Sequence, residues 1–177
     1  MPKHLEKISE EILHQNPWSI YKHDKYLKPN GKNGDYFYMD IKTSVMIVPV
    51  MPDGKIILTL QHRYLMDKQS IEFPAGRVKE NQTILDGAKA EMQEETGCLS
   101  NDIVKIGEFA TAPSSIKNTI HVYLAYVSSQ GRQMLDDSEE IEILYRRPDE
   151  IDEMISNNEI FNGPTMATWS LVRHHLM

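Results

Sequence analysis

The clearest pattern of apolar positions lies between residues 44 and 64. The runs SVMIVPVM (44–51) and KIILTLQHRY (55–64) are long enough for two strands and rich in β-branched residues. Pro52-Asp53-Gly54 separates them, a composition that is typical of a tight turn. The pattern therefore predicts a hairpin of two buried strands, with which a core sheet begins.

Alternating and periodic segments extend this sheet and add helices around it. Further strands are predicted at residues 18–26, 35–41, 103–111, 119–129 and 141–147. Helical spacing of apolar positions predicts helices at residues 1–16, 148–157 and 165–176. Helices that cover a core sheet predict an α/β protein, and the early strands predict a small antiparallel unit at its N-terminus.

Three carboxylates gather on one more predicted helix. Glu91, Glu94 and Glu95 occupy positions i, i+3 and i+4, which share one helix face. Like charges at this spacing repel by a few tenths of a kcal/mol per pair, so we expect something to offset the cost. A hard divalent cation, which prefers carboxylate oxygens, is the natural candidate. The alternative is a solvated acidic face without a ligand.

The flanks of this helix favour a site. An apolar stripe would anchor the helix in a core: Leu85, Ala88 and Met92. Pro74-Ala75-Gly76 before the helix indicates a tight turn, and Gly97 stands where a left-handed residue would end the helix. A strand, a glycine turn, an acidic helix and a glycine stop follow one another in that order.

Composition narrows the classes of function. The 177 residues suffice for one domain with an appendage, which we divide into residues 1–41 and 42–177. The net charge of −7 argues against a nucleic-acid polymer or a membrane as partner. The single Cys98 excludes an internal disulfide and favours a reducing compartment. The charged start is unlike a signal peptide, so the expected location is cytoplasmic.

The segment from Gly76 to Cys98 resembles the signature of the Nudix hydrolases. The glutamates and glycines fall at the spacing of that signature, whereas Gln82 replaces its first glutamate and Ala90 replaces its arginine. The resemblance implies a Nudix-type α/β/α sandwich with a mixed sheet and a pyrophosphohydrolase that uses Mg²⁺ or Mn²⁺. It also implies Glu91, Glu95 and the carbonyl of Ala75 as metal ligands, with Glu94 close by.

The order of elements is similar to the ADP-ribose pyrophosphatase branch of that family. Gln61-His62-Arg63-Tyr64 and Glu72-Phe73-Pro74-Ala75-Gly76 match its motifs, which implies substrate contacts for Arg63 and Glu72. The acidic turn before the strand at 141–147 matches the region of a catalytic base, for which Glu139 is the first choice and Glu140 the second. Surface roles for Arg63 and for this turn are the alternatives.

The same resemblance implies that the N-terminal strand unit exchanges between the two subunits of a homodimer. Aromatic side chains of this unit are candidates for stacking on the nucleotide base, although packing roles are the alternative: Trp18, Tyr21 and Tyr36. The expected reaction is hydrolysis of ADP-ribose to AMP and ribose 5-phosphate.

Three alternatives stay open at this point. The substrate can be another nucleoside diphosphate sugar. Since an arginine that orients the glutamates contributes roughly 1.5 to 3 kcal/mol when buried, Ala90 and Gln82 also allow a nucleotide-binding protein with weakened or lost catalysis. A purely structural dimerisation protein is the third reading.

Overall fold

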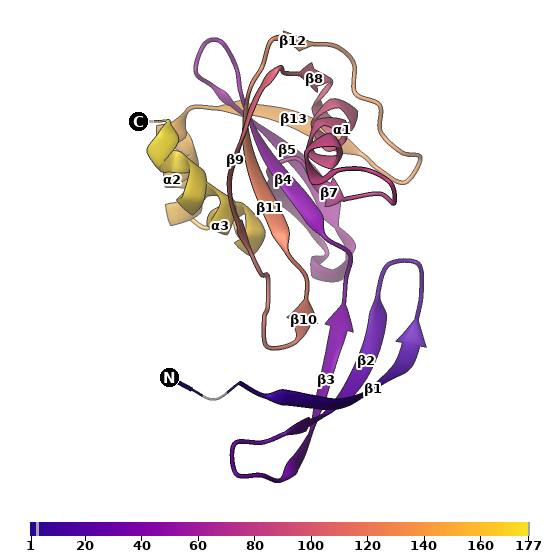
Figure 1. Cartoon of the computed structure of the whole chain (residues 1–177). Coiled ribbons are helices and arrows are strands. Elements are labelled where there is room, and N and C mark those ends of the chain that lie inside the picture. The colour runs from indigo at the N-terminus through magenta and orange to yellow at the C-terminus, as the bar shows by residue number, and fades with distance from the viewer. Residues whose placement is uncertain (3, 177) are drawn as a thin grey trace. The chain divides into compact units, whose positions relative to one another are not determined.

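The computed structural model describes residues 1–2 and 4–176, and the chain divides into two compact units (Figure 1). The first unit contains Met1–Lys42 and Ala110–Thr119, and the second contains Thr43–Phe109 and Ile120–Met177. The sequence did not reveal that residues 110–119 join the first unit. Each unit is described by itself below.

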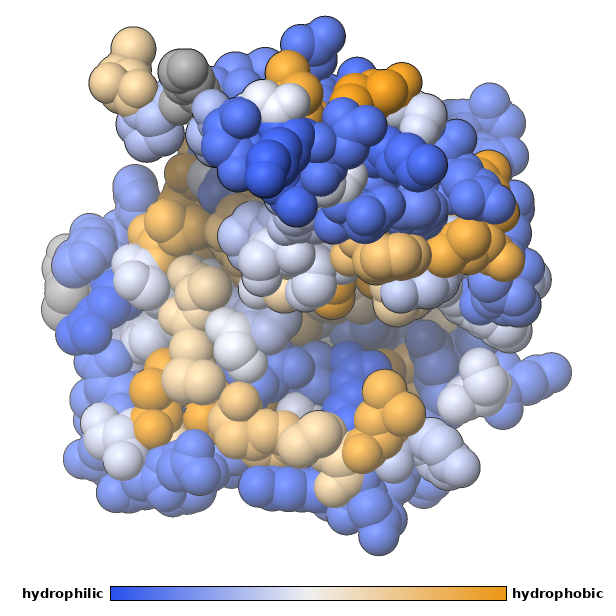
Figure 2. All heavy atoms as spheres, turned by 90° about the horizontal axis from the view of Figure 1, so that it is seen from below, coloured by the Kyte–Doolittle hydropathy of each residue, from blue (hydrophilic) through white to orange (hydrophobic). Residues whose placement is uncertain are grey.

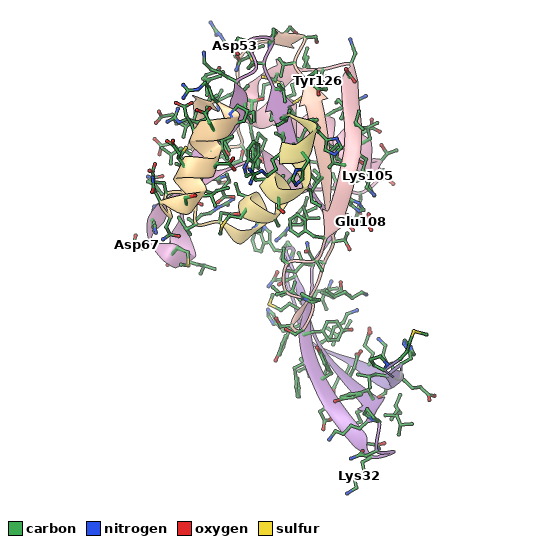
Figure 3. All side chains as sticks on the ribbon, turned by 90° about the vertical axis from the view of Figure 1, so that its left-hand side faces the viewer. Lys32, Asp53, Asp67, Lys105, Glu108 and Tyr126 are labelled. Carbon is green, nitrogen blue, oxygen red and sulfur yellow. The ribbon has the colours of Figure 1, made fainter. Side chains whose placement is uncertain are left out.

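A seven-stranded mixed sheet forms the centre of the second unit. Its strands are β4 (Ser44–Val50), β5 (Ile56–Arg63), β6 (Lys68–Glu72), β7 (Ala75–Arg77), β9 (Asp102–Phe109), β11 (Ile120–Tyr126) and β13 (Ile141–Arg146). The order is β13-β5-β4-β11-β9, while β6 pairs with β5 and β7 pairs with β4. Only the β4–β11 pairing is parallel within this sheet. The predicted hairpin is confirmed, and Asp53 marks its turn in Figure 3.

Helices pack on both faces of this sheet (Figure 1). The helices are α1 (Ile84–Thr96), α2 (Pro148–Ser156) and α3 (Gly163–Val172), with single 3₁₀ turns η1 (Tyr64–Met66) and η2 (Arg173–His175). In β4, Val45 and Ile47 pack with α1, and Met46 and Val48 pack with α2 and α3. Side chains alternate between the faces of a strand, so β4 supports two cores at once. The predicted α/β/α sandwich is confirmed.

Both ends of α1 follow from its sequence. The Thr83 hydroxyl accepts a hydrogen bond from the backbone N–H of Asp86 at 3.1 Å, which satisfies a donor that the first turn leaves free. Gly97 ends the helix with φ of 70°, a conformation that glycine adopts without steric cost. Directly after α1 in the sequence, β8 (Cys98–Leu99) pairs with β12 (Ser129–Gln130) in a two-stranded antiparallel sheet.

The first unit is a four-stranded sheet in the order β1-β2-β3-β10. Its strands are β1 (Glu6–Gln15), β2 (Ile20–Leu27), β3 (Asn33–Asp40) and β10 (Ile116–Lys117). The first three are antiparallel, and β10 pairs with β3 in parallel. The unit is therefore not antiparallel throughout, because a segment from late in the chain adds its last strand. Lys32 marks the turn between β2 and β3 in Figure 3.

The prediction of a helix over residues 1–16 is wrong, since β1 occupies most of this segment. The pairing of β1 with β2 shifts register between Lys7 and Ser9 and again between Ile12 and His14. Each shift adds a residue that breaks the alternation of a strand, as in a β-bulge. Ile8 and Ile12 are four positions apart, a spacing that places them on one face of a helix and equally on one face of a regular strand.

Apolar side chains reach the surface on the face drawn in Figure 2. Exposed apolar residues belong to both units. In the first unit, Ile8, Ile12 and Phe37 are each about half exposed. In the second unit, Tyr64 and Leu65 of η1 are almost fully exposed. Among the described residues, no helix is long and apolar enough to cross a membrane.

Candidate active site

The carboxylates of α1 lie against β7. Gly76 in the middle of β7 pairs with Val45 of β4, which anchors the glycine turn to the centre of the sheet. A Cβ at Gly76 would collide with the carboxylate of Glu91. The absence of a side chain at this position therefore makes room for the Glu91 carboxylate against the strand.

Glu95 is the most deeply buried acid of the cluster, with 4% of its surface exposed. The Oε2 atom of Glu95 has no hydrogen-bond partner among the described residues. A buried carboxylate oxygen without a partner costs free energy, and such atoms are rare in folded proteins. A proton or a cation bound at this position would satisfy the unpartnered oxygen.

The pKa values of Glu91 and Glu95 also favour a bound proton or cation. Burial, and after it the charge of Glu94, raises the pKa of Glu91 to about 7. Burial, and after it the charge of Glu91, raises the pKa of Glu95 to about 8. Two carboxylates that resist ionisation side by side form a site whose charge a divalent cation would neutralise.

The donor set suits a hard divalent cation. The orphaned Oε2 of Glu95 and the Glu91 carboxylate, which fills the space over Gly76, are oxygen ligands of the kind that Mg²⁺ prefers. Within residues 1–2 and 4–176, no group of three or more His, Cys, Asp or Glu side chains is arranged to hold a metal. The predicted set of two carboxylates and the Ala75 carbonyl is smaller than such a group and would leave positions for water and phosphate oxygens.

Arg63 stands at the end of β5 beside Glu72 of β6. Its Nε donates to Glu72 Oε1 at 2.7 Å, and its Nη2 donates to Glu72 Oε2 at 2.5 Å. Glu72 is buried, whereas 45% of the Arg63 side chain is exposed. The hydrogen bonds to Glu72, before any other influence, raise the pKa of Arg63. The fixed guanidinium has five donors, of which two serve Glu72, so its outer edge can take a phosphate.

A long segment before β13 is tied to the end of α1. The Gln133 side-chain Nε2 donates to the carbonyl of Glu95 at 2.7 Å and to that of Ile141 at 3.1 Å. The Met134 N–H donates to the carbonyl of Glu94 at 2.8 Å. These bonds satisfy carbonyls that the last turn of a helix leaves free. They also hold the segment that leads into the acidic turn against the end of α1.

The two base candidates in that turn differ in their surroundings. Glu139 and Glu140 are both exposed. The charge of Glu139 raises the pKa of Arg63, Glu91 and Glu95, though it is not the largest cause in any of the three. The charge of Glu139 therefore reaches the acids of α1 and Arg63. Its carboxylate accepts the N–H of Asp136 at 3.1 Å, which closes the turn.

The predicted base-stacking aromatics belong to the first unit. Trp18 is 65% exposed, Tyr21 is 40% exposed and stacks on Phe37, and Tyr36 donates from its hydroxyl to the carbonyl of Ser114 at 2.6 Å. The hydrogen bond of Tyr36 reaches across 78 residues to the segment that carries β10. These contacts hold within the first unit, and the role of the aromatics toward a nucleotide stays a prediction.

The two departures from the Nudix pattern have different local consequences. The side-chain oxygen of Gln82 accepts the backbone N–H of Lys79 at 3.2 Å, and the backbone N–H of Gln82 donates to the carbonyl of Lys79 at 3.2 Å. Gln82 thus closes the turn that leads into α1. Ala90 is half-buried on α1 and brings no charge to the cluster.

Two contributors to the site were missed by sequence reasoning. Lys79 pairs with Glu94, and Gln133 ties the acidic turn to α1. The contact of Gln133 spans 38 residues, so no local pattern announces it. Lys79 lies three residues after Gly76, and a basic residue in the segment between the glycine turn and the acidic helix was the available signal.

Comparison with known proteins yields one family and several relatives. A family model described as a NUDIX domain matches residues 40–168. The chain is 27% identical over 158 residues to an ADP-ribose pyrophosphatase of Bacillus subtilis, which covers 88% of this chain and 85% of that protein. It is 29% identical over 106 residues to an ADP-sugar pyrophosphatase of Mus musculus, over 54% of this chain and 48% of that one.

Two further matches complete the comparison. A methanol dehydrogenase activator of Bacillus methanolicus is 26% identical over 140 residues, which cover 78% of this chain and 76% of the relative. A solved structure of an ADP compounds hydrolase superposes with a TM-score of 0.86 over 98% of this chain and 95% of its own. At 18% sequence identity, that likeness is one of fold.

Proposed function

The chain belongs to the Nudix family, and we propose that it cleaves the diphosphate of ADP-ribose to give AMP and ribose 5-phosphate. The observation that carries the proposal is the pair of the half-buried Glu91, which lies over Gly76, and the buried Glu95, which has an orphaned carboxylate oxygen; both have raised pKa values. The match to the Bacillus subtilis ADP-ribose pyrophosphatase over most of both chains supports the choice of substrate.

Glu91, Glu95 and the carbonyl of Ala75 would hold Mg²⁺ or Mn²⁺. A bound divalent cation neutralises charge that develops on phosphate oxygens during attack by water. The residues around it then have to orient the diphosphate and accept a proton. Burial of Glu95 and the contact of Glu91 with Gly76 support fixed directions for both carboxylates.

Arg63 is the proposed contact to the diphosphate. Its outer guanidinium edge can donate two hydrogen bonds to one phosphate, a geometry that lysine lacks. Glu72 would act on the substrate through Arg63, because both of its carboxylate oxygens accept from that side chain. This arrangement orients the guanidinium before substrate arrives.

Glu139 is the proposed general base, with Glu140 as the second candidate. The exposed carboxylate of Glu139 can accept the proton of the attacking water and return it to solvent. Its electrostatic effect on Glu91, Glu95 and Arg63 supports this choice. Glu94 and Glu95 complete the group of acids around the reacting atoms.

The first unit is proposed to hold the nucleoside. We place Trp18, Tyr21 and Tyr36 on the nucleotide base, and the exposure of all three supports this role. We further propose that residues 1–41 serve as a dimerisation and substrate-cap region that exchanges between two subunits, while residues 42–177 form the catalytic domain. The exposed apolar residues of β1 and β3 support an interface there. The free, buried Cys98 supports a cytoplasmic setting.

A substrate panel tests the proposal. ADP-ribose, ADP-glucose, UDP-glucose and a nucleoside triphosphate are incubated with the protein and Mg²⁺, and the released nucleoside monophosphate is measured. We expect the highest kcat/KM for ADP-ribose. A preference for ADP-glucose would favour the second candidate, an ADP-sugar pyrophosphatase, which the name of the mouse relative suggests. Turnover of none of these compounds would refute both candidates.

A further inference from the structure

Helix α1 has no positive charge within reach of Glu94. Side chains three and four positions apart are neighbours on a helix. On the N-terminal side of Glu94 these neighbours are Glu91 and Ala90, and on the C-terminal side the helix ends at Thr96. The helix therefore gives Glu94 one repulsive neighbour and no attractive one.

Lys79 supplies the missing charge from the segment between β7 and α1. Its Nζ lies 3.2 Å from Glu94 Oε1 and 3.3 Å from Glu94 Oε2, so it bridges both carboxylate oxygens. The hydrogen bonds between Lys79 and Gln82 close the turn that carries this side chain. The closed turn thus places the ammonium group of Lys79 next to the Glu94 carboxylate.

The influence of Lys79 extends to the rest of the cluster. Its hydrogen bond with Glu94, before any other cause, raises the pKa of Lys79, and the charges of Glu91 and Asp136 raise it further. One lysine therefore acts on two of the three carboxylates of the cluster.

We propose that Lys79 is a positioning residue of the diphosphate site, which holds the Glu94 carboxylate in one orientation and offsets the repulsion between Glu94 and Glu91. The consequence for turnover rests on the function proposed above, whereas the consequence for stability does not. Lys79 is 58% exposed and Glu94 33% exposed along their side chains. An ion pair with this exposure changes an equilibrium or a rate by up to about fivefold.

The helix itself offers a way to test this role. An arginine at position 90 would lie one turn before Glu94, where it can pair with the same carboxylate. If Lys79 fills that role, Ala90→Arg should rescue a variant that lacks the lysine and add little to the native protein. Two positive charges with unrelated roles would instead act additively.

The experiment compares five variants: Lys79→Met, Lys79→Arg, Ala90→Arg, the double variant Lys79→Met/Ala90→Arg, and Lys89→Met. Lys89 is an exposed lysine of the same helix, so its removal controls for the loss of one charge. Two quantities are measured: kcat and KM for ADP-ribose with saturating Mg²⁺, and the denaturant midpoint of unfolding in EDTA at pH 8.

For Lys79→Met we expect kcat to fall about two- to fivefold with KM for ADP-ribose unchanged, and the midpoint in EDTA to fall. Lys79→Arg and the double variant should recover both quantities, and Lys89→Met should match the native protein. Native values for Lys79→Met, or an equal gain from Ala90→Arg with and without Lys79, would overturn the proposal. If the native protein turns over no nucleotide, the proposed function fails and the midpoints alone decide the role of Lys79.

Discussion

Replacing Gly76 by alanine should separate metal binding from folding. The three atoms nearest to an added Cβ are the carboxylate carbon and both oxygens of Glu91. To reach ordinary van der Waals separation, this carboxylate has to retreat by about 1 Å. The atoms that must move are the far end of a flexible side chain, so the strand itself need not shift.

The magnitude of each effect follows from this geometry. Misplacement of a group at a reacting centre by about 1 Å can reduce the rate by about 100-fold. Loss of a supporting contact at a metal site typically lowers the affinity for the metal by about 10- to 100-fold. Gly76 has no positive φ, so an alanine there should leave stability unchanged or raise it by about 0.4 to 1 kcal/mol.

The assay pairs calorimetric titration of Mn²⁺ with urea unfolding in EDTA. Gly107→Ala is the matched control, because Gly107 also lies in a strand of this sheet and an added Cβ would meet Leu171 at an ordinary 3.4 Å. We expect Gly76→Ala to lose metal affinity without loss of stability, and Gly107→Ala to keep its affinity. Native Mn²⁺ affinity in Gly76→Ala would refute the placement of Glu91 as a ligand.

Three further predictions concern stability. Arg63→Met leaves the buried Glu72 without its partner and should lower the unfolding free energy in urea by roughly 1 to 3 kcal/mol. The double variant Arg63→Met/Glu72→Met should recover part of this loss. Equal losses in both variants would contradict the role of this pair. In EDTA, stability should fall by up to about 7 kcal/mol as the pH rises from about 4.5 to about 8, because the folded state holds protons on Glu91 and Glu95 more tightly than the unfolded state, with pKa values of about 7 and about 8. Mg²⁺ should restore the loss at the upper pH, and a flat profile in EDTA would count against the burial of these acids. Thr83→Ala removes the N-cap of α1 and should lower the unfolding free energy by about 1 kcal/mol, and no measurable change would contradict the cap.

The core sheet was predictable because its signals are local. In β4 and β5 the apolar runs and the turn between them lie within about twenty residues of sequence, and both faces are buried along most of β4 and the first half of β5. The start and stop of α1 also depend on neighbouring residues, Thr83 and Gly97. Signals between neighbouring residues predict local structure well, because contacts with distant segments alter it little.

What the sequence did not show depends on contacts between distant segments. The pairing of β10 with β3 joins residues about 77 positions apart, and neither two-residue strand β10 nor its partner signals the other. In β1, the spacing of Ile8 and Ile12 suits a helix as well as a strand, and the pairing with β2 makes this segment a strand. The pattern of a bulged strand can be read only together with the strand that it pairs with.

The candidate site divides in the same way. The acids of α1 and the glycine of β7 are close in sequence, and their spacing predicted the cluster. The partner of Arg63 is Glu72 across a tight strand pair, and the sequence placed both near substrate without pairing them. The tie from Gln133 to the carbonyl of Glu95 has no local signal at all.

The central claim is that the carboxylates of α1 make a metal-dependent diphosphate site. The most direct measurement is the rate of AMP release from ADP-ribose with Mg²⁺, compared between the native protein and Glu95→Gln. The variant keeps the size of the side chain and removes the charge that a cation needs. We predict AMP and ribose 5-phosphate from the native protein, and a rate for Glu95→Gln that is at least about 100-fold lower. Equal rates in the two proteins, or AMP release that persists in EDTA, would contradict the account.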